Sequence, residues 1–150
     1  MNRIHILSSG SKANAFILES DREMILIDQG LSFKEFQKRA DGLGVDVSNI
    51  KGILLTHEHT DHSCGIPYTA FKLGVPVYST EKTISIINSA CKYDLKYKCI
   101  DKDVSFSIGN FSCIPFEIMH DAADPVGFLI RMGPDQTLCF ATDTGKVTNR

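Results

Sequence analysis

The hydrophobic pattern at the start of the chain predicts strands followed by a helix. Residues 3–7 and 15–19 alternate or run apolar, and small turn residues separate them. Residues 24–27 form a continuous apolar run, which is typical of a buried strand. From Ser32 the apolar positions recur every three or four residues up to Leu43, so we expect a helix with Ser32 as its N-cap.

The middle of the chain predicts strands and helices in alternation. The expected elements are a strand at 50–56, a helix at 63–73, a strand at 75–78 and a helix at 81–92. Gly74 is a stop signal for the first of these helices, and Pro67 fits only in its first turn. A segment rich in histidine lies between the first strand and the first helix.

The last third of the chain predicts strands alone, at 104–108, 111–119, 126–132 and 137–142. The whole pattern indicates one α/β layered domain over residues 1–150, with a mixed sheet. The last strands carry apolar residues on both faces, and no predicted helix follows to cover the second face. We therefore expect either a homodimer joined through that face or a missing C-terminal half.

Composition narrows the class of protein. The 150 residues include 18 acidic and 16 basic side chains and are 43% hydrophobic, which excludes disordered and collagen-like chains. The longest apolar runs are far shorter than the ~20 residues of a membrane span or the ~7–15 of a secretory signal, which predicts a cytoplasmic protein without a membrane segment. The five cysteines form no CxxC pair, so we expect reduced, mostly buried thiols.

The segment Thr56-His57-Glu58-His59-Thr60-Asp61-His62 carries the clearest chemical signal. It follows a predicted buried strand, and the carboxyl ends of strands are where α/β sheets place their sites. In an extended segment His57, His59 and Asp61 project to one side, and a turn into the next helix brings His62 beside them. The competing interpretation is a solvated polar loop.

Imidazole and carboxylate groups in this spacing suit zinc, iron, manganese or nickel. The absence of a thiolate cluster argues against a closed structural site and favours an open, catalytic one. Four candidate ligands within six residues, two of them adjacent, favour a two-metal arrangement.

These residues resemble the metallo-β-lactamase superfamily, whose members carry His-x-His-x-Asp-His on the loop after a strand. Asp28 in Leu-Ile-Asp-Gln-Gly, His120 after Phe-Glu-Ile-Met, and Asp143 in Ala-Thr-Asp-Thr-Gly are similar to the other landmarks, in the same order. Residues 8–14 and 27–32 are similar to the YycJ-like branch of predicted exonucleases. The resemblance implies a four-layer αββα sandwich, of which this chain supplies the first half to two-thirds.

The resemblance also implies the metal ligands. His57, His59 and His120 would hold one ion, Asp61 and His62 would hold the other, and Asp143 would bridge the two. Two divalent ions are therefore expected, with zinc the best match and manganese, iron or nickel as alternatives. The second site is expected to be weaker, because the family's further histidine would follow residue 150. Asp28 is expected to orient a ligand histidine rather than to bind a metal.

The other candidate residues are interpreted either as structural or as open between a structural and a functional role. Ser9, Ser11 and Asn14 are equally well interpreted as turn formers or as hydrogen-bond donors to a substrate phosphate. His5 lies in the first predicted strand and is interpreted as structural. Cys64 is interpreted as a small buried side chain rather than a ligand.

The function expected from these residues is a hydrolase that uses a metal-bound hydroxide, with Asp61 as the catalytic residue that orients it. The resemblance to the YycJ-like branch favours cleavage of phosphodiesters, with single-stranded nucleic acid as the substrate. One alternative is hydrolysis of a small ester, lactone or thioester, which the near-neutral charge of the chain slightly favours. Another is an inactive metal-binding half-domain or interaction module.

Overall fold

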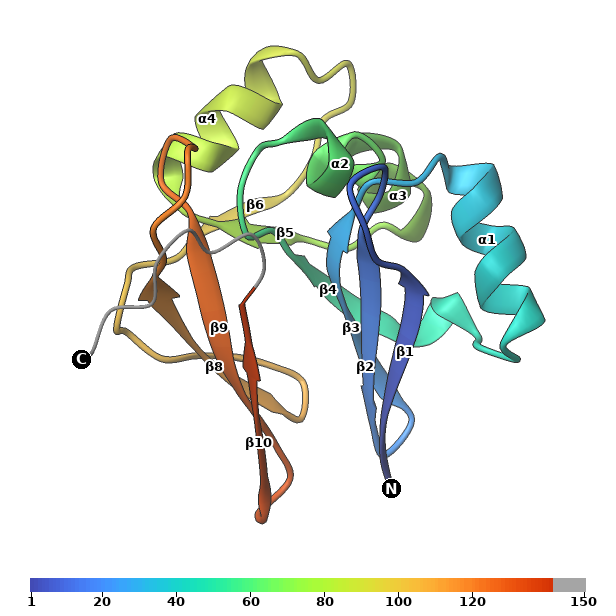
Figure 1. The fold of residues 1–150 in the computed structure, drawn as a ribbon. Helices are drawn as coiled ribbons and strands as arrows, with labels where there is room; N and C mark the ends of the chain where they lie inside the picture. Colours follow the sequence, from blue (N-terminus) through green and yellow to red (C-terminus); the bar gives the residue numbers. More distant parts are fainter. Residues whose placement is uncertain (142–150) are drawn as a thin grey trace.

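The computed structural model describes residues 1–141, which form two facing β-sheets with helices outside the first one (Figure 1). The first sheet has six strands in chain order: β1 (Asn2–Ser8), β2 (Ala15–Ser20), β3 (Glu23–Gln29), β4 (Ile50–Leu54), β5 (Val77–Ser79) and β6 (Tyr97–Cys99). The pairs β1/β2 and β2/β3 are antiparallel, and the later pairs are parallel. The expected mixed sheet is confirmed.

The second sheet is a four-stranded antiparallel meander: β7 (Phe106–Ile108), β8 (Phe111–Glu117), β9 (Val126–Met132) and β10 (Gln136–Phe140). Its strands match the four predicted ones within a few residues at each end. The antiparallel register places Ile114 opposite Leu129, and both side chains point to the same face.

The helices are α1 (Phe33–Gly42), α2 (Thr60–Ser63), α3 (Ile66–Leu73) and α4 (Glu81–Ser89), with a 3-10 turn at Val47–Asn49. Ser32 caps α1 as predicted, because its hydroxyl accepts a hydrogen bond from the Glu35 amide at 3.2 Å. Gly74 ends α3 in the left-handed conformation, at a φ of 66°. None of the helices in this part of the chain is long and apolar enough to cross a membrane.

Two apolar cores lie on the two faces of the first sheet, because neighbouring residues of a strand point to opposite sides. Ile17, Leu26 and Ile53 face α1 and α3, where they meet Phe36 and Ile66. The alternate positions face the second sheet and form a core of Phe16, Leu18, Ile25, Ile27 and Leu54 with Ile108, Phe111, Val126, Phe128 and Ile130. The chain therefore has an α/β fold of three layers, helix, sheet and sheet.

The prediction of one helix at 63–73 is wrong for its first turn. The chain forms the short helix α2, then breaks at Cys64 and Gly65 before α3 begins. Gly65 lies against the end of β3: its amide donates to the Gln29 carbonyl at 2.8 Å, and a Cβ would stand 2.0 Å from the Leu31 carbonyl oxygen. This contact pulls the backbone out of one continuous helix.

The short edge strand β6 was not predicted, because its three residues place lysine between exposed or half-buried neighbours. The expectation that most cysteines are buried is also wrong. Cys64, Cys99 and Cys139 are exposed, and only Cys113 among the free thiols of residues 1–141 is buried.

The first sheet covers most of the apolar side chains of the second sheet. Ile108, Phe111, Phe128 and Ile130 face this shared core and are at most 3% exposed. On the outer face Ile114 and Leu129 remain 37% and 39% exposed, which is a smaller apolar surface than the sequence pattern suggested. Association of two copies through this face stays a prediction.

Candidate metal centre

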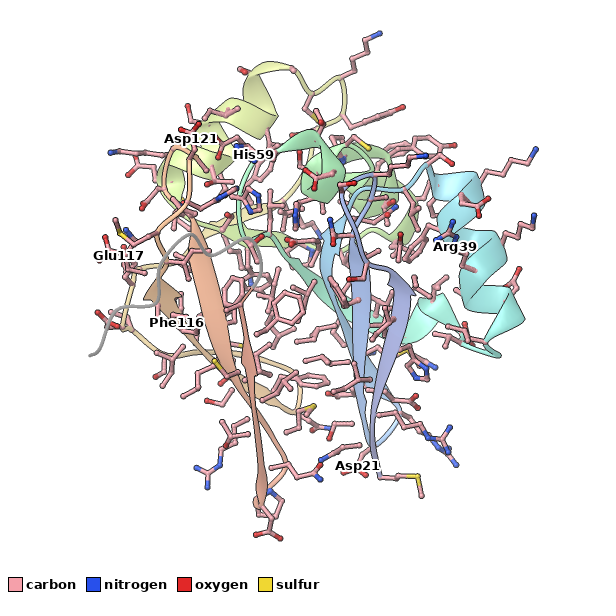
Figure 2. The ribbon with its side chains drawn as sticks, viewed as in Figure 1. Asp21, Arg39, His59, Phe116, Glu117 and Asp121 are labelled. Carbon is pink, nitrogen blue, oxygen red and sulfur yellow. The ribbon has the colours of Figure 1, made fainter. Side chains whose placement is uncertain are left out.

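The polar residues of the motif gather where β3 and β4 end. The loop after β4 carries His57 and His59, and Asp28 is the last residue but one of strand β3. Figure 2 shows His59 at the end of the molecule opposite Asp21, which lies in the turn between β2 and β3. The site thus occupies the carboxyl edge of the parallel strands, as α/β folds favour.

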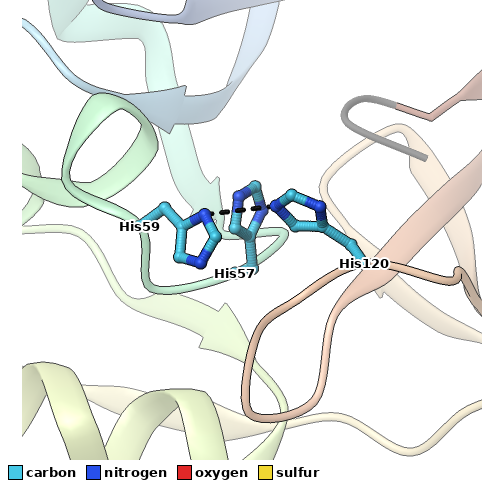
Figure 3. A group of neighbouring side chains, drawn as sticks. All are labelled: His57, His59 and His120. Atoms are coloured by element: carbon cyan, nitrogen blue, oxygen red, sulfur yellow. Dashed lines mark hydrogen bonds between the residues drawn. The ribbon is translucent and has the colours of Figure 1, made fainter. Parts of the chain in front are cut away.

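Three histidines form a compact group at this edge (Figure 3). One ligand nitrogen from each of His57, His59 and His120 lies within 4.8 Å of the other two. His120 Nε2 is 3.1 Å from His59 Nδ1, and the ring centroids of His57 and His120 are 4.8 Å apart. His57 is buried, whereas the other two are half-buried and accessible from solvent.

His120 reaches this group from the loop between β8 and β9, which is tied to the histidine motif. The Ala123 amide donates to the Glu58 carboxylate at 3.0 Å, and the Val126 amide donates to the Thr56 carbonyl at 3.0 Å. The Thr80 hydroxyl donates to the Asp124 carbonyl at 3.1 Å. These bonds bring together residues that lie about sixty positions apart in the sequence, such as His59 and His120.

Asp28 is buried beneath the histidines, and its carboxylate accepts several hydrogen bonds. Its carboxylate accepts from the Thr56 amide and hydroxyl, both at 2.8 Å, and from His62 Nδ1 at 2.6 Å. Burial raises the pKa of Asp28, and the bonds from His62 and Thr56 oppose that rise. Asp28 has a φ of 59°, a conformation that aspartate and asparagine tolerate better than most residues.

These contacts determine which ring nitrogen of His62 and of His57 carries the proton. His62 Nδ1 donates to Asp28, so its lone pair is on Nε2. The Thr56 hydroxyl donates to Asp28 and therefore accepts from His57 Nδ1, at 2.8 Å, which places the lone pair of His57 on Nε2 as well. Support of this kind, from a carboxylate to the second ring nitrogen, is typical of metal-binding histidines.

Asp61 lies in α2 and not in the extended segment expected from the sequence, and His62 lies in the same helical turn. His62 is buried with its ring centroid 4.3 Å from that of His57, whereas the Asp61 side chain is 26% exposed. His62 Nε2 is 3.4 Å from Asp61 Oδ2, so the two form a second donor pair beside the three histidines.

Asn14 joins the loop after β1 to this second pair. Its side-chain nitrogen lies 3.3 Å from Asp61 Oδ2 and 3.2 Å from His62 Nε2, and its backbone amide donates to the Asp61 carbonyl at 2.8 Å. Gly30 lies against the same point, since a Cβ there would stand 1.9 Å from the Asp61 carbonyl oxygen. Only a residue without a side chain lets these three segments meet.

The remaining predicted site residues are placed as follows. Asn14 is buried and bonded within its own turn, whereas Ser9 and Ser11 are exposed at the tip of that turn. Asp143 lies outside the described residues. Cys64 was expected to be buried but is exposed, and its thiol lies 3.0 Å from the Gly30 carbonyl.

The donor set fits a divalent metal ion. Three imidazoles within mutual reach are a ligand set that zinc and similar ions favour, and a site without thiolates and open on one side suits catalysis. Sequence reasoning missed two supporting residues, Thr56 and Glu58. A polar residue at a buried strand end is a weak signal for Thr56, and no local pattern indicates the long-range bond made by Glu58.

The architecture and the site define a class of protein: a partial metallo-β-lactamase fold with the histidines of its metal centre. Residues 23–150 match the family described as the beta-lactamase superfamily domain, and the chain belongs to this superfamily. A metallo-β-lactamase of Cronobacter sakazakii superposes with a TM-score of 0.76 at 13% identity, over 96% of this chain and 59% of that one. A subclass B3 enzyme of Bradyrhizobium japonicum gives the same TM-score at 14% identity, over 91% and 57%.

Curated relatives of the chain include nucleases. The chain is 32% identical to exodeoxyribonuclease YycJ of Bacillus anthracis and 33% identical to exodeoxyribonuclease WalJ of Streptococcus pneumoniae. Each match covers 97% of this chain and 55% of the relative. Ribonuclease J of Helicobacter pylori is 29% identical over 79% of this chain and 19% of its own length. The chain thus spans about half the length of the first two relatives.

Proposed function

We propose that this protein is a metal-dependent hydrolase that cleaves phosphodiester bonds in single-stranded nucleic acid. The observation that carries the proposal is the group of His57, His59 and His120, supported from below by the buried Asp28 network. The nucleases among its relatives support the choice of substrate. Zinc is the metal we propose for the three histidines.

Two groups of residues would each bind one metal ion. His57, His59 and His120 would hold the first ion, and Asp61 with His62 would hold a second, weaker one, with Asp143 as the proposed bridge. Such ions activate water near neutral pH and stabilise charge on the reacting oxygens. Asp28 keeps the proton of His62 on Nδ1, which leaves Nε2 as the donor atom.

We assign to Asp61 the role of orienting the water that attacks the phosphorus. Its carboxylate is partly exposed, and Asn14 holds one oxygen at 3.3 Å. A carboxylate fixed in this way accepts a hydrogen bond from the attacking water and orients it, which raises the rate through positioning. The proposal therefore assigns the catalytic role to Asp61 and the positioning role to Asn14.

The test is hydrolysis of a bis-aryl phosphate and of single-stranded DNA by the 150-residue chain. Chelation should abolish cleavage, and added zinc or manganese should restore it. Asp61→Ala should lower the rate at least about 100-fold while one ion remains bound. Asp135→Ala, an exposed change in the turn between β9 and β10, is the control and should leave the rate unchanged.

Two results would overturn the proposal. One is cleavage of lactones or thioesters without any phosphodiester cleavage under the same metal supplementation. The other is phosphodiester cleavage that survives chelation and the His57→Ala, His59→Ala double substitution. The double variant should also lose the rise in melting temperature that added zinc gives the unchanged chain, since a ligand bound to the native state stabilises it.

A further inference from the structure

Four aromatic side chains form a continuous cluster on the outer side of the helical layer. Phe33 at the start of α1 contacts Tyr68 of α3, with ring centroids 5.5 Å apart. Tyr93, in the segment after α4, lies 5.8 Å from Tyr68 and stacks on Phe71 at 4.7 Å with an interplanar angle of 23°. Three separate segments of the chain thus contribute rings to one surface, which we call the aromatic surface.

The aromatic surface points to solvent. Tyr68 and Phe71 are 42% and 53% exposed, whereas Ile66 and Ala70 of the same helix are buried. They lie three residues apart on α3, on the face opposite to Ile66 and Ala70, which pack on the first sheet. The exposed rings are therefore additional to the core that holds α3 in place.

Positive charge accompanies the rings. Lys34, Lys72 and Lys92 each adjoin a ring of the cluster in the sequence, and all three are exposed. Lys72 lies four residues after Tyr68 and so on the same side of α3. The acidic neighbours are Asp94 and Glu35, and the Glu35 carboxylate pairs with Arg39 at 2.8 Å. Three lysines and one aspartate therefore adjoin the four rings in the sequence, in a chain whose net charge is -2.

We propose that the aromatic surface binds the bases of single-stranded nucleic acid, with the flanking lysines contacting its phosphates. Exposed aromatic faces bordered by cations are the arrangement by which proteins hold single strands without reading their sequence. A hydrophobic protein partner would not require a lysine beside each of three rings. The proposal rests on the proposed function and adds to it the surface that holds the substrate.

The position of the surface in the fold suits a substrate strand. Only two residues separate its central helix α3 from α2, which carries Asp61 and His62 (Figure 1). The surface is separate from the metal centre, because none of its rings belongs to the donor sets. Bases stacked there would anchor the strand while another part of it reaches the metal centre.

The experiment measures binding of a short labelled oligothymidylate by fluorescence anisotropy, with chelator present so that no cleavage occurs. Phe71→Ser and Tyr93→Ser should each weaken binding at least about fivefold, the lower end of a single base–aromatic stack. Ile86→Ser, a change at an exposed apolar residue of α4, is the matched control and should leave affinity unchanged. Lys72→Gln should reduce the dependence of affinity on salt concentration.

A second probe separates stacking from charge. An abasic strand of the same length has the phosphates but no bases, so its weaker binding should not change in Phe71→Ser. Unchanged binding of the oligothymidylate by both aromatic variants overturns the proposal, and so does an aromatic substitution that alters only self-association or protein binding. Cleavage of the bis-aryl phosphate tests the metal centre independently, so a failure of the aromatic surface and a failure of the proposed function give different results.

Discussion

Asp28→Asn is the substitution that tests the organisation of the metal centre most directly. Asparagine keeps the size of the side chain and tolerates the φ of 59° at this position, so the backbone need not move. It replaces an acceptor oxygen by an NH2 group. The carboxylate of Asp28 accepts three hydrogen bonds, and an amide turned either way sets a donor against a donor of Thr56 or His62.

The magnitude decides which readout is informative. Each hydrogen bond to a charged group contributes about 1.5–3 kcal/mol, so losing the two bonds to Oδ2 costs about 3–6 kcal/mol. The amide avoids the desolvation of a buried charge, which returns several kcal/mol. Because these two contributions offset each other, the free energy of unfolding is a poor measure of the role of Asp28. Metal affinity is a better one, since losing such support of a ligand histidine lowers it about 10–100-fold.

The assay is competition for zinc between the protein and a chromophoric chelator. Asp28→Asn should bind zinc about 10–100-fold more weakly, and nitrogen NMR should show the proton of His62 moved from Nδ1 to Nε2. Asp46→Asn is the control, because Asp46 is exposed and caps only the 3-10 turn. Equal zinc affinity in Asp28→Asn and the unchanged chain would refute the role given to Asp28.

Three further expectations concern packing. Gly30→Ala should lower both the melting temperature and zinc affinity, because its Cβ would stand 1.9 Å from the Asp61 carbonyl oxygen, and circular dichroism with the chelator assay checks this. Phe128→Ala should cost about 3–5 kcal/mol in urea unfolding, whereas Leu129→Ala on the outer face should cost far less. Burial raises the pKa of the Cys113 thiol to about 12, so iodoacetamide should modify Cys113 only after unfolding, as mass spectrometry would show.

The sequence predicted the helices and strands whose hydrophobic pattern extends over several residues. The period of α1 and the apolar runs of β3 and β4 were sufficient, because α1 buries one face against the first sheet and the two strands are buried on both faces. It did not predict the break between α2 and α3. That break depends on a contact of Gly65 with Gln29 at the end of β3 and with Leu31 just after it, more than thirty positions away, and no local pattern records such a contact.

The candidate site shows the same division between local and long-range information. The spacing of His57 and His59 predicted a metal centre, and resemblance was needed to add His120, whose place depends on bonds from its loop to Thr56 and Glu58. Asp61 was expected beside His57 and His59, but the turn of α2 carries it towards Asn14 instead. Residue types and spacing can therefore identify the donors, but only the folded loops decide which donors share an ion.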